Sequence, residues 1–148
     1  MKSSISLENI WSDSDVVELN IVANDGKSSF TNTVYVSYLE IDNLINGLDI
    51  FKTHIYGGIY DIELGKFGPE YANGAFYGRL HFNVNKRGEI YVSIRMQTDF
   101  FDFGIKKVAS EVVIYMITEP ALLDNFIYKL KLISKELGNI AMLECIEL

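Results

Sequence analysis

Apolar residues recur along the chain with two different periods, one typical of strands and one typical of helices. Val17, Leu19 and Ile21 alternate with polar residues, which predicts a strand. The turn residues at 24–26 and the run rich in β-branched residues at 30–37 then predict a hairpin.

A helical period follows directly in residues 37–54. Ser37 and Glu40 have the spacing of a capping box, in which each side chain accepts a hydrogen bond from an otherwise unpaired N–H at the helix start. Gly47 lies inside this segment and lowers its helix propensity by about 1 kcal/mol relative to Ala. We therefore expect this helix to depend on packing.

A second amphipathic helix is predicted in residues 118–138. Thr118 is a candidate N-cap, and Pro120 suits the first helical turn. Gly138 is a natural stop signal. A wide apolar stripe that includes Leu137 runs along the whole segment.

The clearest hairpin in the chain is centred on Gly88, which we expect to adopt a left-handed conformation. Alternation and turn chemistry together predict a register with Leu80 opposite Ile94 on the core face. The same register places Arg79 directly opposite Arg95 on the other face, which is an unfavourable like-charge pair.

Further strands are predicted in residues 59–67, 105–118 and 139–148, so the element order is β-β-α-β-β-β-β-α-β. We expect one α+β domain over residues 1–148, with a single mainly antiparallel sheet of about six to seven strands and both helices on one face. The other face would be open to solvent. The expected core comprises Ile41, Leu44, Leu48, Leu122, Phe126 and Leu130, packed against Leu80, Phe82, Val92 and Ile94.

The open face would carry an unusual group of polar and aromatic side chains: Tyr77, Arg79, His81, Tyr91 and Arg95. Two explanations remain open for the neighbouring arginines. Acidic side chains could neutralise them, with Asp61 or Glu63 on one side and Glu111 on the other. Alternatively, the guanidinium groups could bind an anionic ligand, which would indicate a small-ligand-binding protein or an enzyme.

Signs of catalysis are weak in this sequence. His54, His81 and Cys145 are too few and too dispersed for a zinc site, and no elbow motif accompanies a conceivable His81–Cys145 or His81–Ser93 dyad. We therefore predict no catalytic residues, no metal, no cofactor and no disulfide. Cys145 is expected to be a buried hydrophobe.

Composition narrows the class of partner. The net charge is −7, which opposes binding to nucleic acid or to an anionic membrane. No signal peptide is apparent and there is one cysteine, which is typical of a reducing compartment such as the cytoplasm.

The segment TDFFDFG at 98–104 places aromatic rings and carboxylates at the tip of a predicted hairpin. Phe100 has the parity of the core and is expected to close its edge. Exposed rings beside acids are typical of a protein interface. The candidate partner-binding residues are Asp99, Phe101, Asp102 and Phe103.

The overall layout resembles bacterial immunity proteins of polymorphic and contact-dependent toxin systems, in particular those of wall-associated toxins. The resemblance rests on the early hairpin (VVELNIVANDG to VYVSYLE), the helix LEIDNLINGL, the strand GEIYVSIRM and the helix EPALLDNFIYKLKLI. It implies a non-enzymatic acidic protein that neutralises a toxin, often a basic nuclease. The oligomeric state is left open by the sequence.

Overall fold

The computed structural model describes residues 2–147 and is an α+β structure with two helices. The helices are α1 (Tyr38–Phe51) and α2 (Pro120–Leu130). The strands are β1 (Ser4–Ser12), β2 (Val16–Asn24), β3 (Ser29–Ser37), β4 (Ile59–Leu64), β5 (Ala75–Phe82), β6 (Ile90–Gln97), β7 (Phe101–Phe103), β8 (Lys106–Val108), β9 (Glu111–Thr118) and β10 (Ile140–Glu144).

These strands form three antiparallel sheets, so the prediction of a single sheet of six to seven strands is wrong. The first sheet has the order β10-β1-β2-β3, the second has the order β4-β5-β6-β9, and β7 pairs only with β8. The main cause of the error is β1, a strand that was not predicted. It lies between β2 and β10 and draws them into a sheet of their own.

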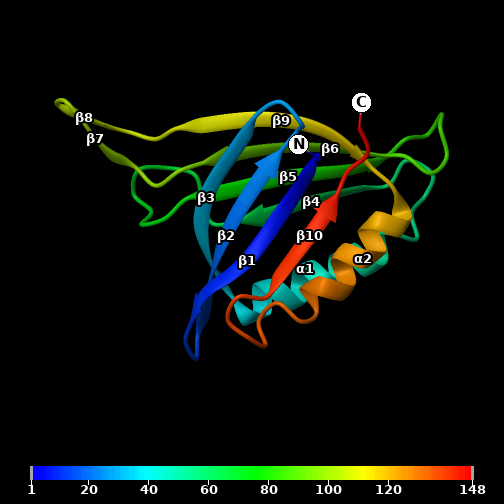
Figure 1. Ribbon diagram of the computed structural model, residues 1–148, viewed down its shortest axis with the longest axis horizontal. Coiled ribbons are helices and arrows are strands. Elements are labelled where there is room, and N and C mark those ends of the chain that lie inside the picture. The colour runs from blue at the N-terminus through cyan, green and yellow to red at the C-terminus, as the bar shows by residue number, and fades with distance from the viewer. Residues whose placement is uncertain (1, 148) are drawn as a thin grey trace.

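The two four-stranded sheets and both helices share one hydrophobic interior (Figure 1). A small apolar void of about 20 Å³ illustrates the arrangement, because its lining includes Leu7 of β1, Leu80 of β5, Leu44 of α1 and Phe126 of α2. The predicted core residues are buried, except that Leu122 is half-buried and its neighbour Leu123 is buried in its place. The outer face of the second sheet remains exposed, as expected.

Hydrogen bonds join the two four-stranded sheets along both sides. On one side, the Asn32 side chain of β3 donates to the carbonyl oxygens of Ala75 and Gln97, each at 2.9 Å. On the other side, the N–H of Ile146 donates to the carbonyl oxygen of Ile117 in β9 at 2.8 Å. The second sheet is thereby fixed relative to the first at both margins.

The start of α1 confirms the predicted capping box. Ser37 Oγ accepts from the N–H of Glu40, and Glu40 Oε1 accepts from the N–H of Ser37, both at 3.1 Å. These bonds satisfy two N–H groups that the helix itself cannot pair.

Helix α2 departs from its prediction at both ends. Its N-cap is Glu119 rather than Thr118, whose hydroxyl instead donates to the carbonyl oxygen of Glu144 at 2.7 Å. Pro120 occupies the first turn as expected. The helix ends at Leu130, well before Gly138, and Leu137 is exposed.

The early end of α2 has a physical reason in two asparagine side chains. Asn139 Nδ2 donates to the carbonyl oxygen of Leu132 at 2.8 Å, and the buried Asn9 Nδ2 donates to that of Ile133 at 3.1 Å. Both carbonyls are thus engaged by side chains outside the helix. Residues 131–138 therefore form tight turns instead of extending α2.

The central hairpin differs from its predicted register by two residues. Leu80 lies opposite Val92 instead of Ile94, and Arg79 lies opposite Ser93 instead of Arg95. Because the shift is even, every side chain keeps its predicted face. Other pairs in this register include Phe82 with Ile90, His81 with Tyr91 and Tyr77 with Arg95.

Asn83 explains this shift. Its Oδ1 accepts from the N–H groups of Asn85 and Lys86 at 2.9 and 3.2 Å, which forms a local turn before the expected one. The loop is therefore longer than the predicted turn. Gly88 does take the predicted left-handed conformation, with φ of 88°.

Candidate protein-binding site

A narrow two-stranded extension, here called the arm (residues 98–110), projects from the β6–β9 pair. Figure 1 shows it reaching beyond the body at the end of the molecule away from the helices. Its base is held by Thr98 and Ser110. The Thr98 N–H donates to the Ser110 carbonyl oxygen at 2.9 Å, and the Ser110 N–H donates to Thr98 Oγ1 at 3.0 Å.

A β-bulge separates the arm from the sheet. Between the pair Gln97–Glu111 and the pair Phe101–Val108, the first strand advances one residue more than the second. An extra residue of this kind interrupts the ladder and increases the local twist. Phe100 lies in the bulge and is half-buried, and its predicted packing at the core edge stays a prediction.

The tip of the arm is a two-residue turn at Gly104 and Ile105. Gly104 has φ of 67°, the left-handed value that such a turn favours at its first central position. Ile105 is fully exposed, which is unusual for a large aliphatic side chain. The tip therefore presents an apolar group to solvent.

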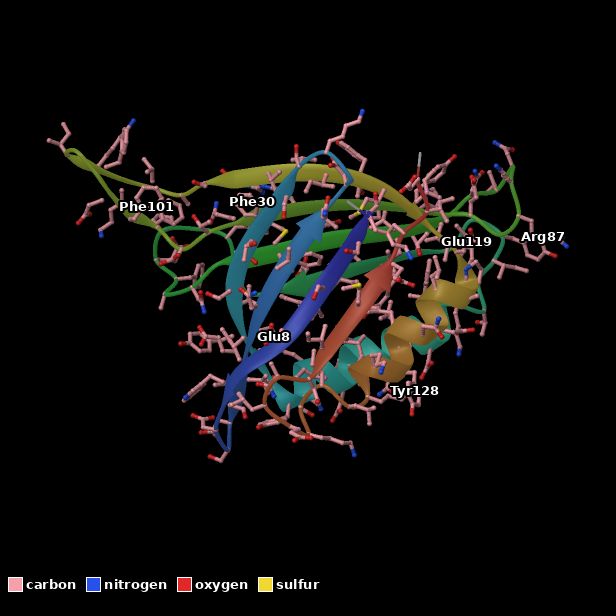
Figure 2. The ribbon with its side chains drawn as sticks, in the orientation of Figure 1. Glu8, Phe30, Arg87, Phe101, Glu119 and Tyr128 are labelled. Atoms are coloured by element: carbon pink, nitrogen blue, oxygen red, sulfur yellow. The ribbon has the colours of Figure 1, made fainter. Side chains whose placement is uncertain are left out.

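The arm has two chemically different faces. Phe101 and Phe103 lie on the same face because they are two residues apart, and the cross-strand partner of Phe101 is Val108. They are 46% and 64% exposed. On the opposite face, Asp102 Oδ1 lies 3.2 Å from Lys107 Nζ. Figure 2 shows Phe101 on the arm, far from Tyr128 on α2.

The arginines of the outer sheet face are each neutralised by a different carboxylate. Arg79 donates from Nε to Asp61 Oδ1 at 2.7 Å and from Nη2 to Asp61 Oδ2 at 3.0 Å. This contact lowers the pKa of Asp61 and raises the pKa of Arg79. The predicted direct Arg79–Arg95 pair is wrong, because the register places them diagonally, but neutralisation by acidic side chains is confirmed.

Arg95 is held on two sides. It donates from Nη2 and Nε to Glu111 Oε1 at 2.6 and 3.0 Å. The ring of Phe67 lies 4.2 Å from its guanidinium carbon, within the range of a cation–π interaction. No single acidic group bridges Arg79 and Arg95 in the described part of the chain, since each has its own carboxylate.

His81 and Tyr91 contact each other, and Tyr91 also bonds to a neighbouring asparagine. Their rings meet edge to face, with centroids 6.4 Å apart. Tyr91 Oη accepts from Asn83 Nδ2 at 2.9 Å, and Tyr77 lies beside Arg95 in the adjacent strand. The structure thus gathers the five predicted side chains on one face, with several of their polar atoms engaged within the protein.

Sequence reasoning missed the surroundings of the 65–74 loop. One hollow of about 370 Å³ is lined by residues that include Phe67, Tyr77 and Arg95. Another of about 350 Å³ lies beside Tyr35 and Tyr71. The glycines of this loop were the available signal for close packing, but the partners of Gly74, which include the backbones of Thr33 and Gln97, are distant in the sequence.

Cys145 and Asp61 do not have the properties of catalytic groups. Cys145 is 2% exposed, and burial raises its pKa to about 12, which disfavours the nucleophilic thiolate. The pKa of Asp61 is lowered, whereas a general acid needs a raised one. Within residues 2–147, no three His, Cys, Asp or Glu side chains converge on a common metal position.

No family model and no curated protein matches the chain. A chain of the CdiA-CT/CdiI toxin and immunity complex from Enterobacter cloacae is similar, with a TM-score of 0.46 and 13% identity over 88% of this chain and 99% of that one. Across the described residues, neither helix has the length and apolar character needed to cross a membrane.

Proposed function

We propose that this chain is a non-enzymatic cytoplasmic protein that binds and neutralises a protein partner, as an immunity protein neutralises a bacterial toxin. The observation that carries the proposal is the arm, which holds Phe101, Phe103 and Ile105 in solvent on a ribbon that projects from the body.

Physical chemistry favours a partner for such a ribbon. An isolated two-stranded hairpin is only marginally stable in water, and it gains stability when its apolar face is covered. Fully burying one Phe side chain contributes about 1.5–3 kcal/mol. Aromatic anchors of this kind dominate the binding energy of many protein interfaces.

Charge supports a basic partner. The chain has a net charge of −7, which would accelerate the encounter with a positively charged protein. The resemblance of the sequence pattern to toxin immunity proteins supports a bacterial toxin as that partner. A basic toxin domain satisfies both the charge and the resemblance.

The alternative function, binding of a small anion on the outer sheet face, has weaker support. An anion at Arg79 would have to share the guanidinium with Asp61 or displace it, and an anion at Arg95 would have to do the same with Glu111. The arm requires no such displacement, because its aromatic rings are already exposed.

The first test is the neighbouring reading frame, which should encode a basic toxin domain. That domain then serves as the binding probe. Calorimetry should detect binding, and co-expression should relieve its toxicity. The double variant Phe101→Ser/Phe103→Ser should weaken binding by more than about 2 kcal/mol, or roughly 30-fold, with almost no change in melting temperature. The matched control is Leu39→Ser/Ile50→Ser, which removes two exposed apolar side chains from α1.

Two results would contradict the proposal. If the Phe variant unfolds, the rings belong to the core. If the wild type binds no protein and a metabolite co-purifies, the outer sheet face becomes the functional site.

Neutralising Asp99 and Asp102 should mainly slow association and reduce its salt dependence, while leaving dissociation nearly unchanged.

A further inference from the structure

The four-stranded sheets have four edge strands, and three of them are covered or short. Loop 65–74 reaches β3, where the Gly74 N–H donates to the Thr33 carbonyl oxygen at 2.9 Å. Helix α1 packs against β4, and β10 has only five residues, with α2 packed against it. Strand β9 has eight residues, and within residues 2–147 only Ile146 pairs with its outer edge.

The direction of the free backbone groups on β9 follows from this one bridge. Since the Ile117 carbonyl accepts from the Ile146 N–H, the backbone of Ile117 points away from β6. Backbone direction alternates along a strand, so Glu111, Val113 and Tyr115 point the same way. These residues form an open row of donors and acceptors along one side of the molecule, the uppermost strand in Figure 1.

This edge also lacks the features that usually prevent strand addition. Natural edge strands are protected by lysine, proline or a bulge. Strand β9 (EVVIYMIT) contains no lysine, arginine or proline, and its pairing with β6 runs without a register shift. Val113 and Tyr115 are 57% and 67% exposed. Its one charged residue, Glu111, is already neutralised by Arg95.

We propose that the β9 edge binds the same edge of a second copy of this chain. Ile146 already pairs with the outer side of Ile117, and the bulge ends the regular ladder beyond Glu111. With respect to the described residues 2–147, the unpaired segment of this edge is therefore 111–115, and its centre is Val113. A two-fold axis there places Val113 opposite Val113 of the second copy and Glu111 opposite Tyr115 of the second copy.

A second copy fits this edge because an antiparallel pair about a two-fold axis is self-complementary. The two Glu111 side chains are kept apart in this register, and each retains its own Arg95, so the net charge of each chain is not concentrated at the contact. The contact involves a short segment, and interfaces of small area are weak. The dimer should therefore form reversibly with rising concentration.

Sedimentation velocity from about 5 to about 500 µM tests the proposal, because this range covers the affinity of a small interface. The wild type should pass from monomer to dimer. Val113→Lys should weaken the dimer more than about 10-fold, since lysine protects edges. Val84→Lys, at an exposed position in the β5–β6 loop, should leave it unchanged. A wild type that stays monomeric throughout, or a dimer insensitive to Val113→Lys, overturns the proposal.

Cysteine crosslinking tests the register independently of stability. Residues that directly oppose each other in hydrogen-bonded pairs have Cα atoms about 5.5 Å apart, which a disulfide can span. Val113→Cys should therefore form a covalent dimer under mild oxidation. Tyr115→Cys should not, because it would oppose Glu111. Native Cys145 is buried and provides no competing crosslink. Crosslinking through position 115 and not 113 would overturn the proposed axis.

Discussion

The ring of Tyr60 in β4 lies directly on the backbone of Gly47 in α1. A Cβ atom at position 47 would collide with the Tyr60 hydroxyl group and ring. This contact brings the helix close to the second sheet. It also explains why a residue with poor helix propensity is present in the middle of α1.

Gly47→Ala should therefore destabilise the protein by roughly 1–3 kcal/mol, although alanine is favoured by about 1 kcal/mol in an exposed helix. The measurement is urea unfolding. Asn46→Ala is the matched control, because Asn46 is an exposed neighbour in the same helix and its replacement should be neutral or stabilising. Stabilisation by Gly47→Ala would show that Tyr60 can move aside at little cost.

Leu80→Ala and Leu130→Ala should each cost roughly 2–5 kcal/mol of unfolding free energy, because both side chains are 1% exposed and their removal leaves a cavity. Leu137→Ala should cost little, since Leu137 is 65% exposed. Denaturant melts of the three variants compare them directly. A loss below about 1 kcal/mol at Leu80 would place that residue outside the tightly packed core.

The Asp61–Arg79 pair should contribute to acid sensitivity. Arg79 lowers the pKa of Asp61 in the folded state, so the contribution is fully present above the unfolded-state pKa of about 3.9. It is lost as the pH falls through the lower folded-state value. The stability difference between wild type and Asp61→Asn should therefore shrink below about pH 4.

Urea titrations across the acid range measure this difference. Arg79→Gln removes the other partner and should produce a similar loss of pH dependence, and the double variant should add little further. A wild-type advantage that grows toward low pH would contradict the assignment.

Cys145 should react very slowly with a thiol reagent such as DTNB at about pH 8, because burial raises its pKa to about 12 and shields the sulfur. Unfolding in guanidinium should release full reactivity. Rapid native-state modification would show that the segment following β10 opens readily.

Local interactions explain which parts of the fold could be predicted. Ser37 and Glu40 are three residues apart, so their capping box was evident in the sequence and is present in the structure. The turn formed by the Asn83 side chain is equally local, because Oδ1 accepts from residues two and three positions ahead. An asparagine at the end of a strand, just before the polar run 85–87, is a turn signal, and giving it more weight would have corrected the central register.

The other errors arise from distant contacts. Asn9 interrupts the apolar alternation of β1, and its bond to Ile133 helps to end α2, yet the two residues are 124 positions apart. The position of the arm could be predicted from its apolar run and Gly104. The division of its side chains between two faces could not be predicted, because the bulge at 98–100 changes the strand pairing in a way that alternation alone does not show.

Strand β1 has one neighbour from each end of the chain, β2 and β10, and this arrangement affects how the protein folds during synthesis. β1 leaves the ribosome before the other described strands and can pair with β2 at once, but β10 follows all of them in the chain. One side of β1 therefore stays open until β10 has emerged, and such unpaired edges promote aggregation. Completion of the first sheet is a late, long-range step, which slows folding. A chaperone that shields the N-terminal hairpin until release should therefore increase the yield of folded protein.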